Sequence, residues 1–112
     1  MTEPFSVNVD HGPGRVTITV SGEIDLAAVA PLEAARAEAL ASAPDELLVD
    51  LAGVSFIDSS GLKFLLETHR MTERTGCALS LVRPAETAMH VFRLTGTDLR
   101  LPFVAGDPPP GA

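Results

Sequence analysis

The residues best suited to chemistry form one short polar run, Asp58-Ser59-Ser60-Gly61, which follows an apolar stretch and precedes a helical pattern. Aspartate and serine at a helix start accept hydrogen bonds from its free backbone N–H groups, so the simplest role of the run is capping. The same N–H groups and the positive end of the helix dipole favour a phosphate. A phosphoserine there adds up to about two negative charges without melting the helix, as a reversible binding switch requires.

Ser59 can also be considered as a catalytic nucleophile. The nucleophile elbow of α/β-hydrolases needs glycine two positions before and two positions after the serine. Here Ile57 and Gly61 flank Ser59, so only one side fits, and nothing in the sequence points to a histidine base. We therefore expect that this chain is not an enzyme.

The histidines and the single cysteine do not form a recognisable site. His11, His69 and His90 lack metal-ligand spacing with one another or with Cys77. We expect His69 to pack along an apolar helix face and the other two histidines to be solvated. Cys77 begins an apolar run, where a cysteine is more often a small hydrophobe than a nucleophile.

Four carboxylates, those of Glu23, Asp25, Asp50 and Asp58, raise the possibility of a magnesium site. Asp50 lies within an apolar run and Asp58 at its end, so solvation or backbone capping explains each carboxylate more simply. We predict no metal site and no cofactor. The acidic surface would instead help to steer a basic partner toward Ser59.

The composition indicates a protein partner. With 112 residues the chain suits one domain, and its 15 acidic and 8 basic side chains give a formal charge of −7. Nucleic-acid binding depends on basic residues that neutralise phosphates, and an acidic surface is repelled by anionic lipids. These numbers argue against nucleic-acid and membrane partners.

Three further features favour a cytoplasmic location. Cys77 is the only cysteine, so no intrachain disulfide forms, which suits a reducing compartment. Residues 1–4 lack the basic start of a signal peptide, and no apolar stretch approaches the length of a membrane span.

Alternating apolar and polar residues followed by helical periodicity predict an α/β fold around one mixed sheet of four or five strands, packed with helices. The expected strands are a hairpin over 5–20, strands over 47–57 and 77–82, and an edge strand over 99–104. The first expected helix covers 30–42, with Pro31 and Glu33 in its first turn. The second runs from the polar run to Gly76, with Leu62, Leu65, Leu66 and His69 inward, and the third covers 85–95, with Met89 and Phe92 inward. We expect one domain over 5–104 and a flexible tail rich in proline and glycine over 105–112.

Four segments together resemble a known family. Gly22-Glu23-Ile24-Asp25, Leu48-Val49-Asp50-Leu51, the run from Val54 to Leu62, and Leu94-Thr95-Gly96 are similar, in this order, to motifs of bacterial anti-sigma factor antagonists. These proteins are STAS domains of the type that controls sporulation and stress sigma factors. The resemblance runs from about Val7 to Val104, essentially the whole folded part.

The resemblance implies a mechanism of partner switching. Ser59 matches the serine that a cognate anti-sigma factor phosphorylates; that partner is a serine kinase of the GHKL type, so ATP and magnesium belong to it. The unphosphorylated antagonist binds the anti-sigma factor and frees the sigma factor, and a metal-dependent serine phosphatase resets the modified form. Asp25 matches a position at the partner interface. The predicted partner surface comprises Glu23, Asp25, Asp58, Ser59, Ser60, Gly61 and Lys63.

Two positions depart from the family pattern. Lys63 stands where many relatives have a small residue, and it either pairs with the phosphate or alters the choice of partner. Ala85 stands where relatives often have a serine N-cap, so we expect the helix over 85–95 to fray slightly.

A second function remains open: a STAS scaffold subunit that does not switch, in a stress-sensing complex or a lipid-transport ABC system. Relatives of the lipid-transport kind tend to carry threonine in place of the switch serine, and this chain has Ser59.

Overall fold

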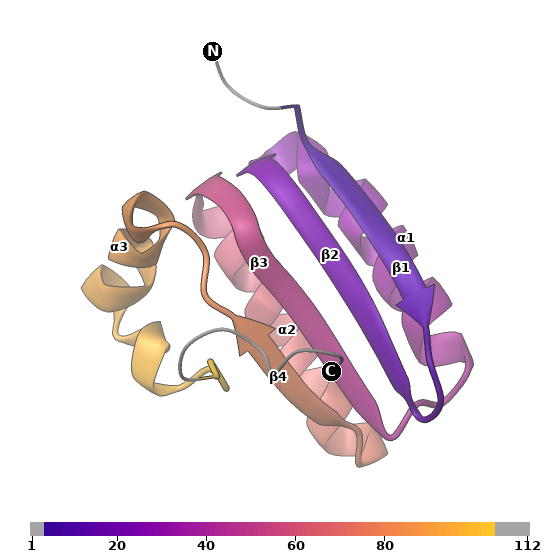
Figure 1. The fold of residues 1–112 in the computed structure, drawn as a ribbon. Coiled ribbons are helices and arrows are strands. Elements are labelled where there is room, and N and C mark those ends of the chain that lie inside the picture. The colour runs from indigo at the N-terminus through magenta and orange to yellow at the C-terminus, as the bar shows by residue number, and fades with distance from the viewer. Residues whose placement is uncertain (1–3, 105–112) are drawn as a thin grey trace.

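A four-stranded sheet forms the centre of the structure, a computed structural model that describes residues 4–104 (Figure 1). The strands are β1 (Ser6–His11), β2 (Arg15–Ile24), β3 (Glu46–Ile57) and β4 (Ala78–Val82), and their order in the sheet is their order in the sequence. β1 pairs antiparallel with β2, whereas the β2–β3 and β3–β4 pairs are parallel. The predicted mixed sheet is confirmed with four strands. The predicted tail over 105–112 lies outside the described residues.

Three helices complete the fold: α1 (Val29–Ala41), α2 (Ser59–Thr75) and α3 (Glu86–Thr95). Short 3-10 turns, η1 (Leu26–Ala28) and η2 (Thr97–Leu99), precede α1 and follow α3. α1 and α2 lie side by side behind the sheet in Figure 1, and α3 lies beside the upper end of β3. Both helices behind the sheet therefore begin where β2 and β3 end.

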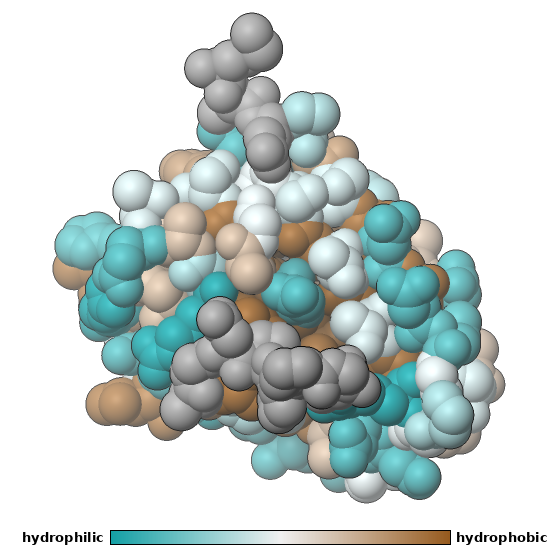
Figure 2. Space-filling view, in the orientation of Figure 1, coloured by the Kyte–Doolittle hydropathy of each residue, from teal (hydrophilic) through white to brown (hydrophobic). Residues whose placement is uncertain are grey.

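The core lies between the sheet and the layer of α1 and α2. In β2, Val16, Ile18 and Val20 are buried, and the threonines between them point to the other face. β3 is apolar almost throughout its first half, as expected of a strand in the middle of a sheet. On the opposite sheet face, β1 and β2 present polar side chains, which appear white and teal in Figure 2.

Two register shifts bend the last part of β2. The pairing of β2 with β3 is irregular between Thr19 and Ser21 and between Gly22 and Glu23. Gly22 has a φ of +90°, and a Cβ there would lie 2.6 Å from the carbonyl oxygen of Pro4, so only glycine fits. After the second shift Ile24 pairs with Ile57, which aligns the ends of the two strands.

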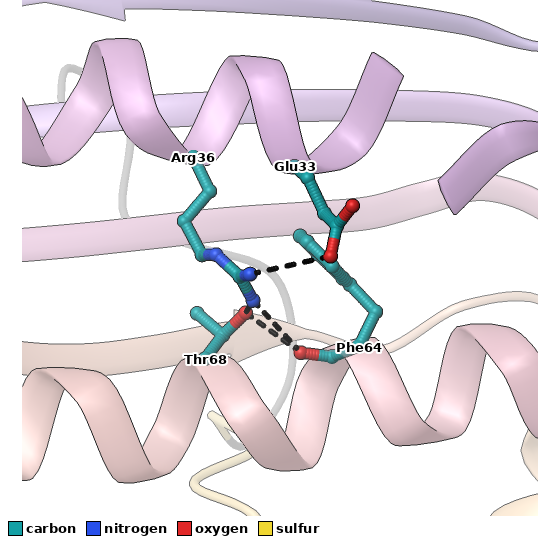
Figure 3. A network of polar contacts seen from close by, with 4 residues as sticks. All are labelled: Glu33, Arg36, Phe64 and Thr68. Carbon is teal, nitrogen blue, oxygen red and sulfur yellow. Dashed lines mark hydrogen bonds and ion pairs between the residues drawn. The ribbon is translucent and has the colours of Figure 1, made fainter. Parts of the chain in front are cut away.

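A buried arginine ties α1 to α2 (Figure 3). Arg36 is 7% exposed, and its Nη1 donates to Thr68 Oγ1 at 2.9 Å. The guanidinium also lies 4.5 Å from the centre of the Phe64 ring, and Glu33 Oε2 is 3.9 Å from its Nη2. Since breaking a buried charged contact leaves its partners unsatisfied, this network fixes how the two helices pack.

The structure corrects three predicted details. α1 begins at Val29, after η1, so Pro31 is its third residue and Glu33 lies beyond its first turn. On α2, Leu66 and His69 are only partly buried, because the helix turns Thr68 and Thr72 toward α1 and the core instead. The predicted edge strand over 99–104 is reduced to one bridge between Leu81 and Phe103, since η2 occupies its start.

Candidate partner-binding site

The candidate site lies where β2 and β3 end together, at the upper ends of these strands in Figure 1. The backbone N–H of Asp58 donates to the carbonyl oxygen of Ile24 at 3.1 Å, just beyond the pair of Ile24 with Ile57. Because the two strands are parallel, the segments that leave them emerge at the same edge of the sheet. The structure thus brings the segment Glu23–Asp25 beside the start of α2, as the predicted surface requires.

Asp58 is the N-cap of α2. Its Oδ1 accepts hydrogen bonds from the backbone N–H groups of Ser60, at 2.9 Å, and Gly61, at 3.3 Å. Its backbone is extended, with φ −108° and ψ −172°, the usual geometry of an N-cap. Of the three candidate capping residues Asp58, Ser59 and Ser60, Asp58 is therefore the one that caps α2.

Ser59 is consequently the first residue of α2, and its side chain is exposed. Within residues 4–104 its hydroxyl forms no hydrogen bond with another residue, because Asp58 already serves the N–H groups. A kinase needs such an accessible hydroxyl. The position also faces the positive end of the helix dipole, where an added phosphate is tolerated.

Asp25 repeats the arrangement at the end of β2. Its Oδ1 accepts from the backbone N–H of Ala27 at 3.0 Å, which caps η1. The side chain is exposed, so its second carboxylate oxygen is free to meet a partner. Two neighbouring strands thus end in capping aspartates at one edge of the sheet.

Gly61 is buried, although it was predicted as part of the partner surface. A Cβ on Gly61 would lie 2.6 Å from Ile24 Cγ2 and 2.6 Å from Ile57 Cγ1. Glycine therefore lets α2 approach the ends of β2 and β3 closely, and it acts on the surface by positioning its neighbours.

The other predicted surface residues differ in exposure. Lys63 is exposed one turn along α2 from Ser59, whereas Glu23 and Ser60 are half-buried. The sequence analysis missed two apolar residues here: Leu26 is 74% exposed, and Phe56 is 47% exposed. The signal for Phe56 was its place directly before the inward Ile57, since alternate residues of a strand point to opposite faces.

Cys77 lies at the other end of the sheet, beside a cavity of about 110 Å³ that Leu40, Ala43, Pro44 and Thr75 also line. Burial raises the pKa of its thiol, and the carboxylates of Asp45 and Glu46 raise it further. The thiol therefore stays protonated at neutral pH, which suits a small buried hydrophobe.

The remaining polar candidates have ordinary surroundings. His90 is exposed, and so is His11, whose Nε2 is 3.4 Å from Glu38 Oε2. Asp50 Oδ1 accepts from the backbone N–H of Ala52 at 2.9 Å, as expected of a backbone-capping residue. Residues 4–104 contain no group of three or more His, Cys, Asp or Glu placed to hold a metal ion. No helix in this part of the chain has the length and apolar character to cross a bilayer.

Comparison with known proteins gives consistent results. The family model described as "Mlab, STAS domain" matches residues 7–102. The anti-sigma-F factor antagonist RsfB of Mycobacterium tuberculosis (strain ATCC 25618 / H37Rv) is 42% identical over 71 residues, which cover 61% of this chain and 57% of RsfB. This match therefore covers less than two thirds of the relative's length. The anti-sigma-B factor antagonist of Bacillus subtilis (strain 168) is 30% identical over 92 residues, which cover 82% of this chain and 84% of that protein.

Solved structures share the fold. The crystal structure of an anti-sigma factor antagonist from Mycobacterium paratuberculosis superposes with a TM-score of 0.81 at 29% identity. The match covers 92% of this chain and 87% of the other.

Proposed function

Since this chain belongs to the STAS domain family, we propose that it is an anti-sigma factor antagonist switched by phosphorylation of Ser59. The unmodified protein binds an anti-sigma factor and so frees a sigma factor. The observation that carries the proposal is the exposed Ser59 hydroxyl at the first position of α2, next to a helix cap that another residue already provides. Modification there changes the surface while leaving the cap in place.

The physical basis of the switch is the charge that the phosphate adds to a docking surface. Leu26 and Phe56 supply exposed apolar area at the same sheet edge as the Ser59 hydroxyl, a combination common in the centre of protein interfaces. A neutral hydroxyl is readily buried against a partner. A phosphate of about two negative charges must lose its hydration on burial, and the nearby Asp58 repels it, so docking becomes unfavourable.

The partners follow from this mechanism. The anti-sigma factor is a serine kinase of the GHKL type that brings its own ATP and magnesium, and a metal-dependent serine phosphatase removes the phosphate. The chain itself has no catalytic role in this proposal, because Ser59 has only one of the two flanking glycines of a nucleophile elbow. These encounters take place in the cytoplasm.

A phosphorylation assay with the purified anti-sigma factor kinase of the same organism tests whether Ser59 is the modified residue. With ATP, the parent protein should gain one phosphate by intact-mass spectrometry. Ser59→Ala should gain none, and Ser60→Ala, next along the helix and not its cap, should be modified like the parent. If Ser59→Ala is phosphorylated as fully as the parent, the assignment of the site is wrong.

Calorimetry tests whether a charge at residue 59 weakens binding to the anti-sigma factor, and it distinguishes the switch from a STAS scaffold subunit. Ser59→Asp should bind the anti-sigma factor at least tenfold more weakly than Ser59→Ala, because it places a charge in the interface. A STAS scaffold subunit of a stress-sensing complex or a lipid-transport ABC system would instead co-purify with its complex regardless of residue 59. Equal binding by both variants would favour that function.

A further inference from the structure

Lys63 lies on the same face of α2 as Ser59. The two residues are four positions apart, which is about one turn and about 6 Å along the axis. Both side chains are exposed, while Leu62 and Phe64 on either side of Lys63 are buried. The burial of these neighbours holds Lys63 on the outer stripe of the helix, in line with Ser59.

In the unmodified helix Lys63 has no strong electrostatic partner within residues 4–104. A cation near a helix N-terminus opposes the dipole. Glu67, four positions further on, is a possible partner, but an acid placed after the lysine is the weaker order of such a pair. Within residues 4–104 Lys63 forms no ion pair. An anion at position 59 would provide the stronger order, with the acid before the lysine.

The charged groups beside Ser59 at the ends of β2 and β3 are acidic, and Arg36 of α1, which also reaches α2, is buried against Thr68 and the Phe64 ring. Asp58 precedes Ser59 directly, and Asp25 and Glu23 lie at the adjacent end of β2. A phosphate on Ser59 therefore meets repulsion from these carboxylates. Among the residues of the predicted partner surface, Lys63 alone is basic, so it alone offers the phosphate a side-chain counter-charge.

We propose that Lys63 is the counter-ion of phosphorylated Ser59. Its ammonium group pairs with the phosphate along the outer face of α2 and favours the fully ionised form. This inference rests on the proposed function and concerns the regulation of the same site. An isolated phosphoserine loses its second proton at a pKa of about 6. Pairing with Lys63 raises the fraction of phosphate that is dianionic at neutral pH, and so increases the charge difference between the phosphorylated and unphosphorylated proteins.

The experiment measures the ionisation of the phosphate directly. Phosphoserine is incorporated at position 59 of the full-length protein during translation, by an expanded genetic code, and the ³¹P resonance is followed against pH. The titration midpoint should lie about 0.3 pH unit lower in the parent than in Lys63→Met. Lys63→Arg should keep the parent midpoint, and 0.5 M salt should reduce the difference, because the pair is exposed.

The matched control is Arg70→Met. Arg70 is exposed on α2, eleven residues from Ser59 and about 16 Å along the axis, so its removal changes the net charge equally without touching the pair. Its midpoint should match the parent. A parent midpoint equal to that of Lys63→Met, or an equal shift in Arg70→Met, overturns the proposal. This measurement uses no kinase, so its failure would overturn the role of Lys63 and leave the assignment of Ser59 as the modified residue untouched. Conversely, phosphorylation of Ser59→Ala by the kinase would overturn the proposed function and leave the titration result unchanged.

Discussion

Two helices of this protein begin in opposite ways. Asp58, the N-cap of α2, binds two backbone N–H groups with its side chain. Ala85, the N-cap of α3, binds none with its side chain. At the capped start of α2 the exposed Ser59 hydroxyl forms no hydrogen bond within residues 4–104, whereas the Thr87 hydroxyl in the first turn of α3 donates to Ser55. Because the cap satisfies the helix, the residue after it is free to serve a partner.

α3 is stabilised by other contacts. Thr87 Oγ1 donates to the carbonyl oxygen of Ser55 at 2.9 Å, and Glu86 and Arg93 form two hydrogen bonds of 2.8 and 2.9 Å. Phe92 is fully buried and meets Phe103 edge to face, with ring centres 5.1 Å apart. The first turn of α3 is therefore held by the side chains of Glu86 and Thr87, whereas the first turn of α2 is held by its N-cap residue. Fraying of α3 stays a prediction.

Substitution of the third residue should give the largest difference in stability between the two helices. This residue is Gly61 in α2 and Ala88 in α3, and both are buried. Gly61→Val should lower the free energy of unfolding by about 3 kcal/mol, because its side chain collides with Ile24 and Ile57. Urea denaturation measures the loss. Ala88→Gly should lose only about 1 kcal/mol, from helix propensity. A Gly61→Val protein as stable as the parent would show that the isoleucines simply move aside.

Removal of the α2 cap should have the next largest effect. Asp58→Ala should cost about 1 kcal/mol of unfolding free energy, because the N–H groups of Ser60 and Gly61 lose their acceptor. Asp58→Asn keeps an oxygen in the same place and should retain most of the stability. Equal losses in both variants would mean that the charge, rather than the cap, stabilises α2.

The missing cap of α3 can be supplied. Ala85 is exposed and already has an extended backbone, with φ −56° and ψ 154°, which suits a capping serine. Ala85→Ser should raise the free energy of unfolding by about 0.5 kcal/mol and slow amide hydrogen exchange in the first turn of α3. Exchange that remains as fast as in the parent would show that the cap is not what limits this helix.

The smallest effect concerns pH. A hydrogen bond from Arg93, together with its charge, lowers the pKa of the exposed Glu86 carboxyl in the folded protein. Stability from this pair is therefore present above the ordinary glutamate pKa and is lost as pH falls through the lowered one. By NMR, the carboxyl of Glu86 should titrate at a higher pH in Arg93→Met than in the parent. An unchanged midpoint would show that the pair does not persist in solution.

Much of the fold was predictable because it depends on local patterns. Alternation in β2, the continuous apolar run of β3 and the cap signal at Asp58 each reflect the neighbours of a residue in sequence. The adjacency of Asp25 to the start of α2 was different. It depends on the parallel register of Ile24 with Ile57, and at the sequence level only the family resemblance implied a shared surface.

What could not be predicted depends on contacts between distant elements. Arg36, in an alanine-rich helix, has the pattern of a solvated residue, and it becomes buried only because α1 packs against Thr68 of α2. Gly61 reads as part of an exposed polar run, yet the aligned ends of two strands press against it. In both cases the environment arises from tertiary packing, which no short window of sequence contains.

The contact between Arg36 and Thr68 has a consequence for how this sequence can diverge. Loss of Thr68 alone leaves the buried Arg36 guanidinium with only its longer contacts, 3.4 Å to the carbonyl oxygen of Phe64 and 3.9 Å to Glu33. An aliphatic pair of similar volume at both positions fills the same space at little loss. Positions 36 and 68 should therefore vary together among descendants of this sequence, as a covarying pair that reports the spacing of α1 and α2.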